Sequence, residues 1–304
     1  MRIEKVAIIG KGAVGMLYGS MIESALGPGA VEFVMDDGRF ARHANDVVTI
    51  NGEPCKIATV PASRARKADA VLLTIKTTGL ALALDTMEAV VGPQTRIASL
   101  CNGIRSEAAI AERFGWERTV LSVAQGMDAV FIGDALTFTH TGEICFGAAE
   151  GTDDAAVSDL ADLYDRAGIS HGVEVDIRHR MWTKLMLNVG LNQTCMVYAG
   201  NYGSVSDPTG EQFRCFVAAM REVRAVAEAE GVRLTEYDLT QMIELVRGLD
   251  PAGMPSMAQD RVNGKLTEVE EFSGTIRELG CRHGIVTPTN DWLYERVRQI
   301  ESGL

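Results

Sequence analysis

Several features are missing from the chain or scarce in it, and each absence argues against a class of protein. The six cysteines form no CxxC pair and the five histidines form no HxxxH or HxH pair, so we expect no zinc site. No apolar run approaches the roughly 20 residues that span a bilayer. Basic residues (29) are fewer than acidic residues (41), and the net charge of −12 argues against nucleic acid or a membrane surface as partners.

The remaining composition is that of a globular protein in a reducing compartment. Apolar residues make up 46% and charged residues 23% of the chain. We expect no signal peptide, because the apolar stretch near Met1–Val6 is short and leads into a glycine motif. The widely spaced cysteines favour buried, reduced thiols, which predicts a cytoplasmic protein. At 304 residues the chain is long enough for two domains.

The first half alternates short apolar runs with helical patterns. The expected strands cover residues 6–9, 31–35, 70–75, 95–100 and 119–123. Two hairpins are expected as well, one of residues 47–50 and 55–60 around Asn51-Gly52, and one of residues 136–140 and 144–147. Continuous apolar strands are typical of a parallel sheet covered on both faces. Residues 1–175 are therefore predicted to form an α/β, doubly wound Rossmann-type domain.

The second half, residues 176–304, is predicted to be an all-α domain. Helical periodicity covers residues 177–199, 235–247, 268–283 and 289–301. Asp207-Pro208 predicts the start of a further helix that runs to about Glu230, with Gly231 just past its end.

The glycine motif predicts a dinucleotide site. It reads Gly10-Lys11-Gly12-Ala13-Val14-Gly15, follows the first strand and opens a helix. Such glycines allow a tight turn, close approach of a pyrophosphate and helix–strand packing, while the helix N-terminus faces the anion. Asp36 ends the second strand, where a carboxylate would bond the 2′-hydroxyl of NAD, whereas Arg39 and Arg42 would suit the 2′-phosphate of NADP.

Two more residues follow apolar strands and are candidates for contacting the cofactor. Lys76 and Asn102 come at the carboxyl ends of the third and fourth strands of the main sheet, where ligands bind in open α/β sheets. The alternatives are a solvent-exposed lysine and an asparagine that caps the next helix.

The segment from Met181 to Thr194 carries the most specific pattern. Lys184, Asn188 and Asn192 recur at i, i+4 and i+8 and so share one face of a helix that is otherwise apolar almost all round. A lysine and two amides in such a helix are costly unless they are paired or face a polar cleft. Partial desolvation makes such a lysine a usable proton donor. The alternative is a polar stripe that faces water.

A last group of polar residues surrounds Ser256 and Glu268. The segments read Pro255-Ser256-Met257-Ala258-Gln259-Asp260 and Lys265-Leu266-Thr267-Glu268-Val269-Glu270-Glu271. Taken alone, Ser256 would cap a helix and Glu268 would lie on a solvated acidic face.

Together these motifs resemble the ketopantoate reductase (2-dehydropantoate 2-reductase) family over nearly the whole chain. The resemblance implies reduction of the 2-keto group of ketopantoate to pantoate, on the route to pantothenate and coenzyme A. It implies Lys184 as general acid and Glu268 as the group that holds the substrate hydroxyl and orients the lysine. It also implies that Asn188, Asn192, Asn201 and Ser256 bind the substrate, a small anionic keto acid. Lys76 and Asn102 would lie beside the cofactor.

Three departures from the family pattern leave the substrate and the cofactor open. Asp36 stands where the family often has arginine, Gln193 where it commonly has proline, and Ser273 where it often has asparagine. NADP(H) is favoured by the resemblance, and NAD(H) is kept open by Asp36. The alternatives are a reductase of another 2-keto acid and an NAD(P)-sensing protein without turnover. Either a monomer or a homodimer is consistent with the sequence.

Overall fold

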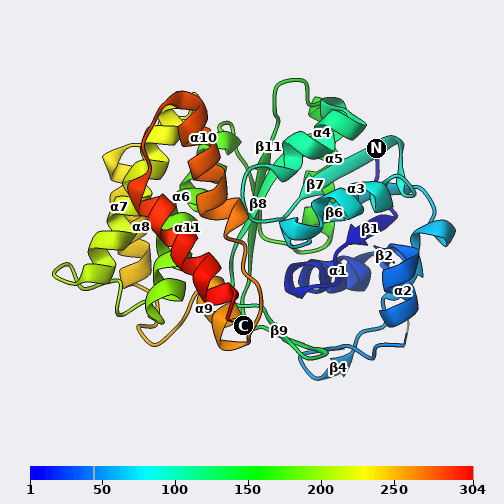
Figure 1. Ribbon diagram of the computed structural model, residues 1–304. Coiled ribbons are helices and arrows are strands. Elements are labelled where there is room, and N and C mark those ends of the chain that lie inside the picture. The colour runs from blue at the N-terminus through cyan, green and yellow to red at the C-terminus, as the bar shows by residue number, and fades with distance from the viewer. Residues whose placement is uncertain (44, 304) are drawn as a thin grey trace. The chain divides into compact units, whose positions relative to one another are not determined.

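Residues 1–43 and 45–303 are described by a computed structural model, in which the chain divides into two units, Met1–Ile177 and Arg178–Leu304. The first unit is built on an eight-stranded sheet with the order β12-β11-β8-β7-β6-β1-β2-β5 (Figure 1). Its strands are β1 (Val6–Ile9), β2 (Val31–Met35), β5 (Ala58–Pro61), β6 (Ala68–Leu73), β7 (Val91–Ser99), β8 (Thr119–Met127), β11 (Thr141–Gly147) and β12 (His171–Val173). Six neighbouring strands of the sheet are parallel to one another, namely β8, β7, β6, β1, β2 and β5. Next to them, β11 is antiparallel to β8 and parallel to β12.

Helices cover both faces of this sheet, which explains the continuous apolar strands. The helices are α1 (Ala13–Leu26), α2 (Asp37–His43), α3 (Leu80–Met87), α4 (Ser106–Phe114) and α5 (Asp154–Arg166), with short 3₁₀ turns at Ala62–Arg64, Thr77–Gly79 and Trp116–Arg118. Val6 and Ile8 belong to a core shared with α1 and α5, whereas Ala7 and Ile9 belong to a core shared with α3 and α4. The predicted doubly wound α/β domain is therefore confirmed, with an antiparallel addition at one edge.

A second, four-stranded sheet brings together two distant segments of the first unit. Its order is β4-β3-β10-β9, formed by β3 (Thr49–Ile50), β4 (Glu53–Pro54), β9 (Val130–Ile132) and β10 (Ala135–Thr137). Asn51 and Gly52 form the expected hairpin turn, with φ of 48° and 88°. The single strand expected over residues 55–60 was wrong, because β4 ends at Pro54 and β5 joins the main sheet beside β2.

The second predicted hairpin, of residues 136–140 and 144–147, was also wrong. β10 pairs with β3 and β9, and β11 pairs with β8 and β12. The carboxylate of Asp128 accepts hydrogen bonds from the backbone N–H groups of Thr139 and His140, both at 2.8 Å. A side chain thus takes up the donors that a strand would use, and the chain passes from one sheet to the other.

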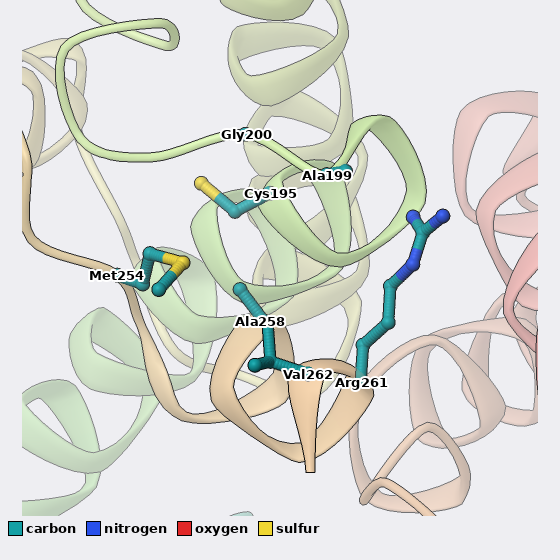
Figure 2. A pocket seen from close by; sticks show the side chains of 7 residues that line it. All are labelled: Cys195, Ala199, Gly200, Met254, Ala258, Arg261 and Val262. Carbon is teal, nitrogen blue, oxygen red and sulfur yellow. The ribbon is translucent and has the colours of Figure 1, made fainter. Parts of the chain in front are cut away.

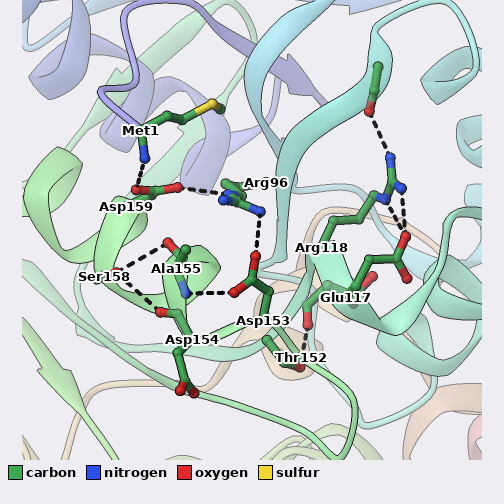
Figure 3. Close-up of polar contacts among 12 residues, drawn as sticks. Met1, Arg96, Glu117, Arg118, Thr152, Asp153, Asp154, Ala155, Ser158 and Asp159 are labelled. Atoms are coloured by element: carbon green, nitrogen blue, oxygen red, sulfur yellow. Dashed lines mark hydrogen bonds and ion pairs between the residues drawn. The ribbon is translucent and has the colours of Figure 1, made fainter.

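An ion cluster around the buried Asp159 ties α5 to the sheet (Figure 3). Asp159 on α5 accepts from Arg96 Nε on β7 at 2.8 Å and from the amino group of Met1. Arg96 also lies 3.6 Å from Asp153, whose other oxygen accepts from Ala155 N and caps α5. Since Asp159 is 7% exposed, both of its partners are needed to offset the loss of solvation.

Residues 178–303 contain helices and connecting segments but no strand. The helices are α6 (Ile177–Tyr198), α7 (Glu211–Ala229), α8 (Glu236–Arg247), α9 (Ser256–Val262), a π-helical turn η4 (Glu270–Gly274), α10 (Thr275–His283) and α11 (Pro288–Glu301). The predicted helical character of this half is confirmed. No helix within the described residues has both the length and the apolarity that a membrane span requires.

The ends of these helices follow the local sequence with one exception. Thr235 caps α8 in a reciprocal arrangement with Asp238, and Gly231 follows α7 with φ of 77°. The helix start expected at Asp207-Pro208 was wrong, since α7 begins at Glu211. The Asp207 side chain accepts from Thr209 N at 2.9 Å and closes a turn ahead of the helix.

Candidate active site

The glycine motif lies in the turn between β1 and α1. Gly10 has φ of 119°, a value that a residue with a side chain rarely adopts, and Gly12 is the N-cap residue of α1. Thr74, which follows β6, supports the turn: its N–H donates to Ile9 O and its hydroxyl to Gly10 O, both at 2.8 Å. This residue was not among the predicted site residues, because its contact depends on the neighbouring strand.

The space around each glycine tests whether the turn fits a dinucleotide. A Cβ on Gly15 would lie 2.1 Å from Gly10 O and 2.5 Å from Thr74 Oγ1, so this glycine serves packing of helix on strand. A Cβ on Gly12 would meet nothing within 4 Å. Open space therefore lies next to the first N–H groups of α1, which suits a pyrophosphate. Ala13 and Val14 begin α1 and are half-buried.

Lys11 points across the sheet from this turn. Its Nζ donates to Thr59 Oγ1 on β5 at 3.1 Å and lies 5.9 Å from the centre of the Phe33 ring on β2. These contacts hold its cationic group beside the middle of β2 and β5. The lysine thus adds positive charge on the side of the turn where β2 and β5 lie.

Asp36 follows β2 and serves as a cap for α2. Its Oδ1 accepts from Arg39 N at 2.8 Å, and its carbonyl accepts from Phe40 N at 2.9 Å. Arg39 and Arg42 are exposed on α2. Arg64 was not predicted, yet it stacks on Phe40 of α2 at 5.4 Å and adds a third guanidinium to this end of the sheet. Both the carboxylate expected for NAD and the cations expected for NADP are therefore present at this place.

Lys76 and Asn102 come after β6 and β7, which are neighbours in the sheet and run parallel to β1. Because parallel strands end at one edge, both residues lie at the edge that holds the glycine turn. Lys76 is exposed and Asn102 is half-buried. The N-cap position of α4 is Arg105, so the alternative of Asn102 as its cap does not hold.

The three polar residues of the second unit lie in one row on α6. Lys184 and Asn188 are half-buried, and Asn192 is 5% exposed. Their neighbours Met181, Trp182, Leu185, Met186, Val189 and Leu191 are buried. A row that merely faces water is thus excluded for Asn192. Asn192 Nδ2 donates to Asn188 Oδ1 at 3.2 Å, so the two amides act as a linked pair.

Ser256 is brought to this pair, although 64 residues separate it from Asn192. The Ser256 hydroxyl donates to Asn192 Oδ1 at 2.9 Å, and Met257 N donates to the same oxygen at 3.1 Å. Pro255 holds the N-cap position of α9, so Ser256 does not cap that helix. Asn192 instead accepts the N–H of Met257, the second residue of α9, and the amide pair of α6 is fixed to the start of α9.

Glu268 and Asn201 have different surroundings. Glu268 is 7% exposed, so it does not lie on a solvated acidic face. Next to it, Thr267 donates from its N–H and its hydroxyl to Glu301 Oε1, at 2.8 and 2.7 Å, which fixes this segment to α11. Asn201 Oδ1 accepts from Ser204 N at 2.9 Å within its own loop. The roles expected for both residues stay predictions.

A pocket of about 180 Å³ lies beside the end of α6 (Figure 2). It is lined by Cys195, Ala199, Gly200, Met254, Ala258, Arg261 and Val262. Burial raises the pKa of the Cys195 thiol to about 12, so this group stays neutral near pH 7. Arg261 donates to Met196 O and Val197 O and so neutralises the last carbonyls of α6. Cys195 comes three residues after Asn192 on α6, and the residues that line the pocket do not include those of the polar row.

The described residues contain no group of three or more His, Cys, Asp and Glu side chains that could hold a metal ion. All six cysteines are described and none forms a disulfide. Three are buried, while Cys281 is exposed, which differs from the expected burial.

Comparisons with known proteins agree with this arrangement. The family model "Ketopantoate reductase PanE/ApbA" matches residues 6–151, and its C-terminal counterpart matches residues 176–301. A 2-dehydropantoate 2-reductase from Caulobacter vibrioides is 30% identical over 287 residues, which are 94% of this chain and 95% of that protein.

Solved structures share the fold. A PanE/ApbA family ketopantoate reductase from Ralstonia eutropha is 26% identical, with a TM-score of 0.84 over 98% of this chain and 99% of the other. A D-mandelate dehydrogenase solved with NADH and anilino(oxo)acetate is 23% identical, with a TM-score of 0.84 over 98% of both chains. The chain therefore belongs to the ketopantoate reductase family of oxidoreductases.

Proposed function

We propose that this chain reduces the 2-keto group of ketopantoate to give pantoate, with NADPH as the reductant. Family membership supports the reaction, and one structural observation carries the assignment to these residues. Lys184, Asn188 and Asn192 form a polar row on a helix that is otherwise buried, and Asn192 is bonded to Ser256. A helix that only packed would not place a lysine and two amides there.

Lys184 is the proposed proton donor of the reaction. When bound, the reduced nicotinamide supplies a hydride. Reduction of a keto carbon builds negative charge on its oxygen, and the Lys184 ammonium stabilises that charge and donates its Nζ proton. This stabilisation is greatest in the transition state, so it accelerates the chemical step.

The substrate would be oriented by the side chains around Lys184, namely Asn188, Asn192, Ser256 and Glu268. Asn192 uses its oxygen for α9 and its Nδ2 for Asn188, and thus fixes the positions of Asn188 and Ser256. Asn188 would then present the N–H groups of its Nδ2 to the substrate carboxylate, and the Ser256 hydroxyl would turn from Asn192 to donate to the same carboxylate. Glu268 would accept the hydrogen bond of the substrate hydroxyl, and Asn201 is kept as a further substrate residue.

NADPH oxidation followed by absorbance in the presence of ketopantoate tests this function. Lys184→Ala should lower kcat by about 10²–10⁴-fold, the usual contribution of a general acid, while the Kd of NADPH stays unchanged. Lys67→Ala is the matched control, because Lys67 is an exposed lysine of the first unit. Absence of turnover in the wild type, or near-normal activity of Lys184→Ala, would contradict the proposal.

Reduction of another 2-keto acid is the second candidate. Gln193 and Ser273 depart from the family pattern and are buried directly beside the proposed substrate residue Asn192 and after Glu268. A panel of 2-keto acids ranked by kcat/KM distinguishes the two, since ketopantoate should lead by about tenfold, or about 1.4 kcal/mol of transition-state binding. Tight NADPH binding with no oxidation across the panel would instead favour a sensor.

The cofactor is a nicotinamide dinucleotide, and we place NADP(H) ahead of NAD(H). Arg39, Arg42 and Arg64 gather at the end of β2, although Asp36 provides the carboxylate that NAD requires. Light scattering after size-exclusion chromatography decides between monomer and homodimer. Cell fractionation tests the cytoplasmic location.

A further inference from the structure

The turn that follows Glu268 is π-helical. Gly274 N donates to Val269 O, five residues back, at 2.9 Å, whereas Phe272 N donates to Glu268 O, four residues back, at 3.3 Å. One extra residue is therefore accommodated between these two bonds. π-helical turns are rare and are frequent at functional sites.

Gln193 takes up the donor that this turn releases. In an α-helix Ser273 N would donate to Val269 O, but Gly274 N uses that oxygen. Ser273 N instead donates to Gln193 Oε1 at 3.2 Å. Gln193 and Ser273 are both fully buried, so no solvent replaces this bond. The two departures from the family pattern noted in the sequence thus contact each other.

Both partners are held rigidly on their far sides. Gln193 Nε2 donates to Val189 O of its own helix at 2.7 Å. The Ser273 hydroxyl bonds Asn290 Oδ1 at 3.0 Å, and Asn290 Nδ2 donates to Glu222 Oε2 at 2.7 Å. Glu222 also accepts from Asn290 N at 2.8 Å. A continuous chain of hydrogen bonds therefore joins α6, η4, α11 and α7.

This series of hydrogen bonds links the segments that carry two residues of the proposed site, Asn192 and Glu268. Gln193 directly follows Asn192, and the π-helical turn begins two residues after Glu268. Loss of the extra residue from the turn would rotate one side of it by about 100° and shift it by about 1.5 Å relative to the other. A misplacement of about 1 Å can lower a rate by about 10²-fold.

We propose that Gln193 and Ser273 are positioning residues, which hold the π-helical turn and thereby the direction of Glu268 relative to Asn192. The proposal rests on the function above, in which Glu268 holds the substrate hydroxyl. Gln193 does not contact the substrate and acts through the turn. Its removal should therefore affect the recognition of that hydroxyl and leave the binding of the dinucleotide unchanged.

The experiment compares two substrates that differ only in the hydroxyl. Gln193→Met keeps the length of the side chain and removes both hydrogen bonds. It should lower kcat/KM for ketopantoate by about 10–100-fold. For 3,3-dimethyl-2-oxobutanoate, which has the same carbon skeleton without the hydroxyl, kcat/KM should change by less than about threefold. The Kd of NADPH should equal that of the wild type.

Two controls separate positioning from general damage. Thr194→Val alters the adjacent, equally buried residue, whose hydroxyl donates to the Cys215 thiol at 3.6 Å, and should leave both substrates unaffected. Gln193→Glu, whose carboxyl should stay protonated at this buried position, keeps an acceptor for Ser273 N and a donor for Val189 O, and should keep most of the activity with ketopantoate. If Gln193→Met does not fold, Gln193→Asn replaces it, because its amide is too short by one methylene to span the gap.

Amide hydrogen exchange over residues 269–275 provides a readout that does not depend on the substrate. Exchange should be faster in Gln193→Met than in the wild type and in Thr194→Val. Equal loss of activity with both substrates, full activity, or unchanged exchange would overturn the proposal. If the wild type does not turn over ketopantoate, the proposed function fails, while the exchange comparison still decides whether Gln193 holds the turn.

Discussion

Two alanine substitutions in the glycine motif should separate stability from cofactor binding: one should lower the Tm and the other should weaken the binding of NADPH. In Gly15→Ala, the new Cβ would lie 2.1 Å from Gly10 O and 2.5 Å from Thr74 Oγ1, well inside contact distance. The backbone of the turn must move, and overpacking of this kind costs about 1–3 kcal/mol. For a unit of this size the cost corresponds to a fall in Tm of about 2–12 °C.

Gly12→Ala should leave the fold intact. Its Cβ would meet nothing within 4 Å, and the φ of −102° at this position is open to alanine. Replacing glycine at a helix N-cap costs less than about 1 kcal/mol. The added methyl group, however, occupies the space beside the first N–H groups of α1. NADPH should therefore bind at least about tenfold more weakly, which is about 1.4 kcal/mol.

Thermal unfolding without cofactor and fluorescence titration with NADPH measure the two effects separately. Gly15→Ala should show the lower Tm, and Gly12→Ala should show the weaker binding at nearly normal Tm. Normal NADPH affinity in Gly12→Ala would refute the assignment of this turn to the cofactor. An unchanged Tm in Gly15→Ala would refute the packing argument.

Three further outcomes are expected. Asp36→Ser keeps an oxygen that can cap α2 but removes the negative charge. NADH should then bind about tenfold more weakly in titrations, because a hydrogen bond to a charged group contributes about 1.5–3 kcal/mol. An unchanged NADH affinity would argue against contact between Asp36 and the ribose. Asp159→Asn breaks a buried ion pair and should lower the free energy of unfolding, measured in urea, by about 3–5 kcal/mol. Asp162→Asn, which breaks an exposed pair on the same helix, should lower it by less than about 0.5 kcal/mol. Similar losses in the two variants would contradict the role of burial. Burial raises the pKa of Asp238, but the hydrogen bonds from Thr235 outweigh this effect and hold the pKa below its usual range, so the stability from this carboxylate is complete above about pH 4 and is lost as the pH falls through the lowered pKa. Urea titrations at several acidic pH values should show that the free energy of unfolding depends less on pH in Asp238→Asn than in the wild type. An equal pH dependence in the two proteins would contradict this role.

Local patterns predicted the elements of the fold because each depends on neighbouring residues. The run Val6–Ile9 before a glycine turn, the helical pattern of α6 and the glycine just past the end of α7 are all readable from neighbouring residues. The domain boundary after residue 175 and the roles of the site residues stay predictions.

Features that depend on distant partners were missed for the same reason. The pairing of β10 with β3, the support of Gly10 by Thr74 and the bond between Gln193 and Ser273 join residues far apart in sequence. The π-helical turn was missed as well, because α10 after it has only nine residues, too short a stretch for the apolar pattern to reveal a phase change of about 100°. The bond from the Ser256 hydroxyl to Asn192 was not foreseen either, since only the alternatives of substrate binding and helix capping were considered for this serine.

The small sheet has a consequence for the nascent chain. Asn51 Oδ1 accepts from Phe138 N across 87 residues, and β3 pairs with β10 nearby. At a synthesis rate of about 5–20 residues per second, a ribosome needs roughly 4–17 s to deliver the second segment after the first. During that interval β3 has no β10 to pair with, so this part of the small sheet can form only after residue 138 has been made.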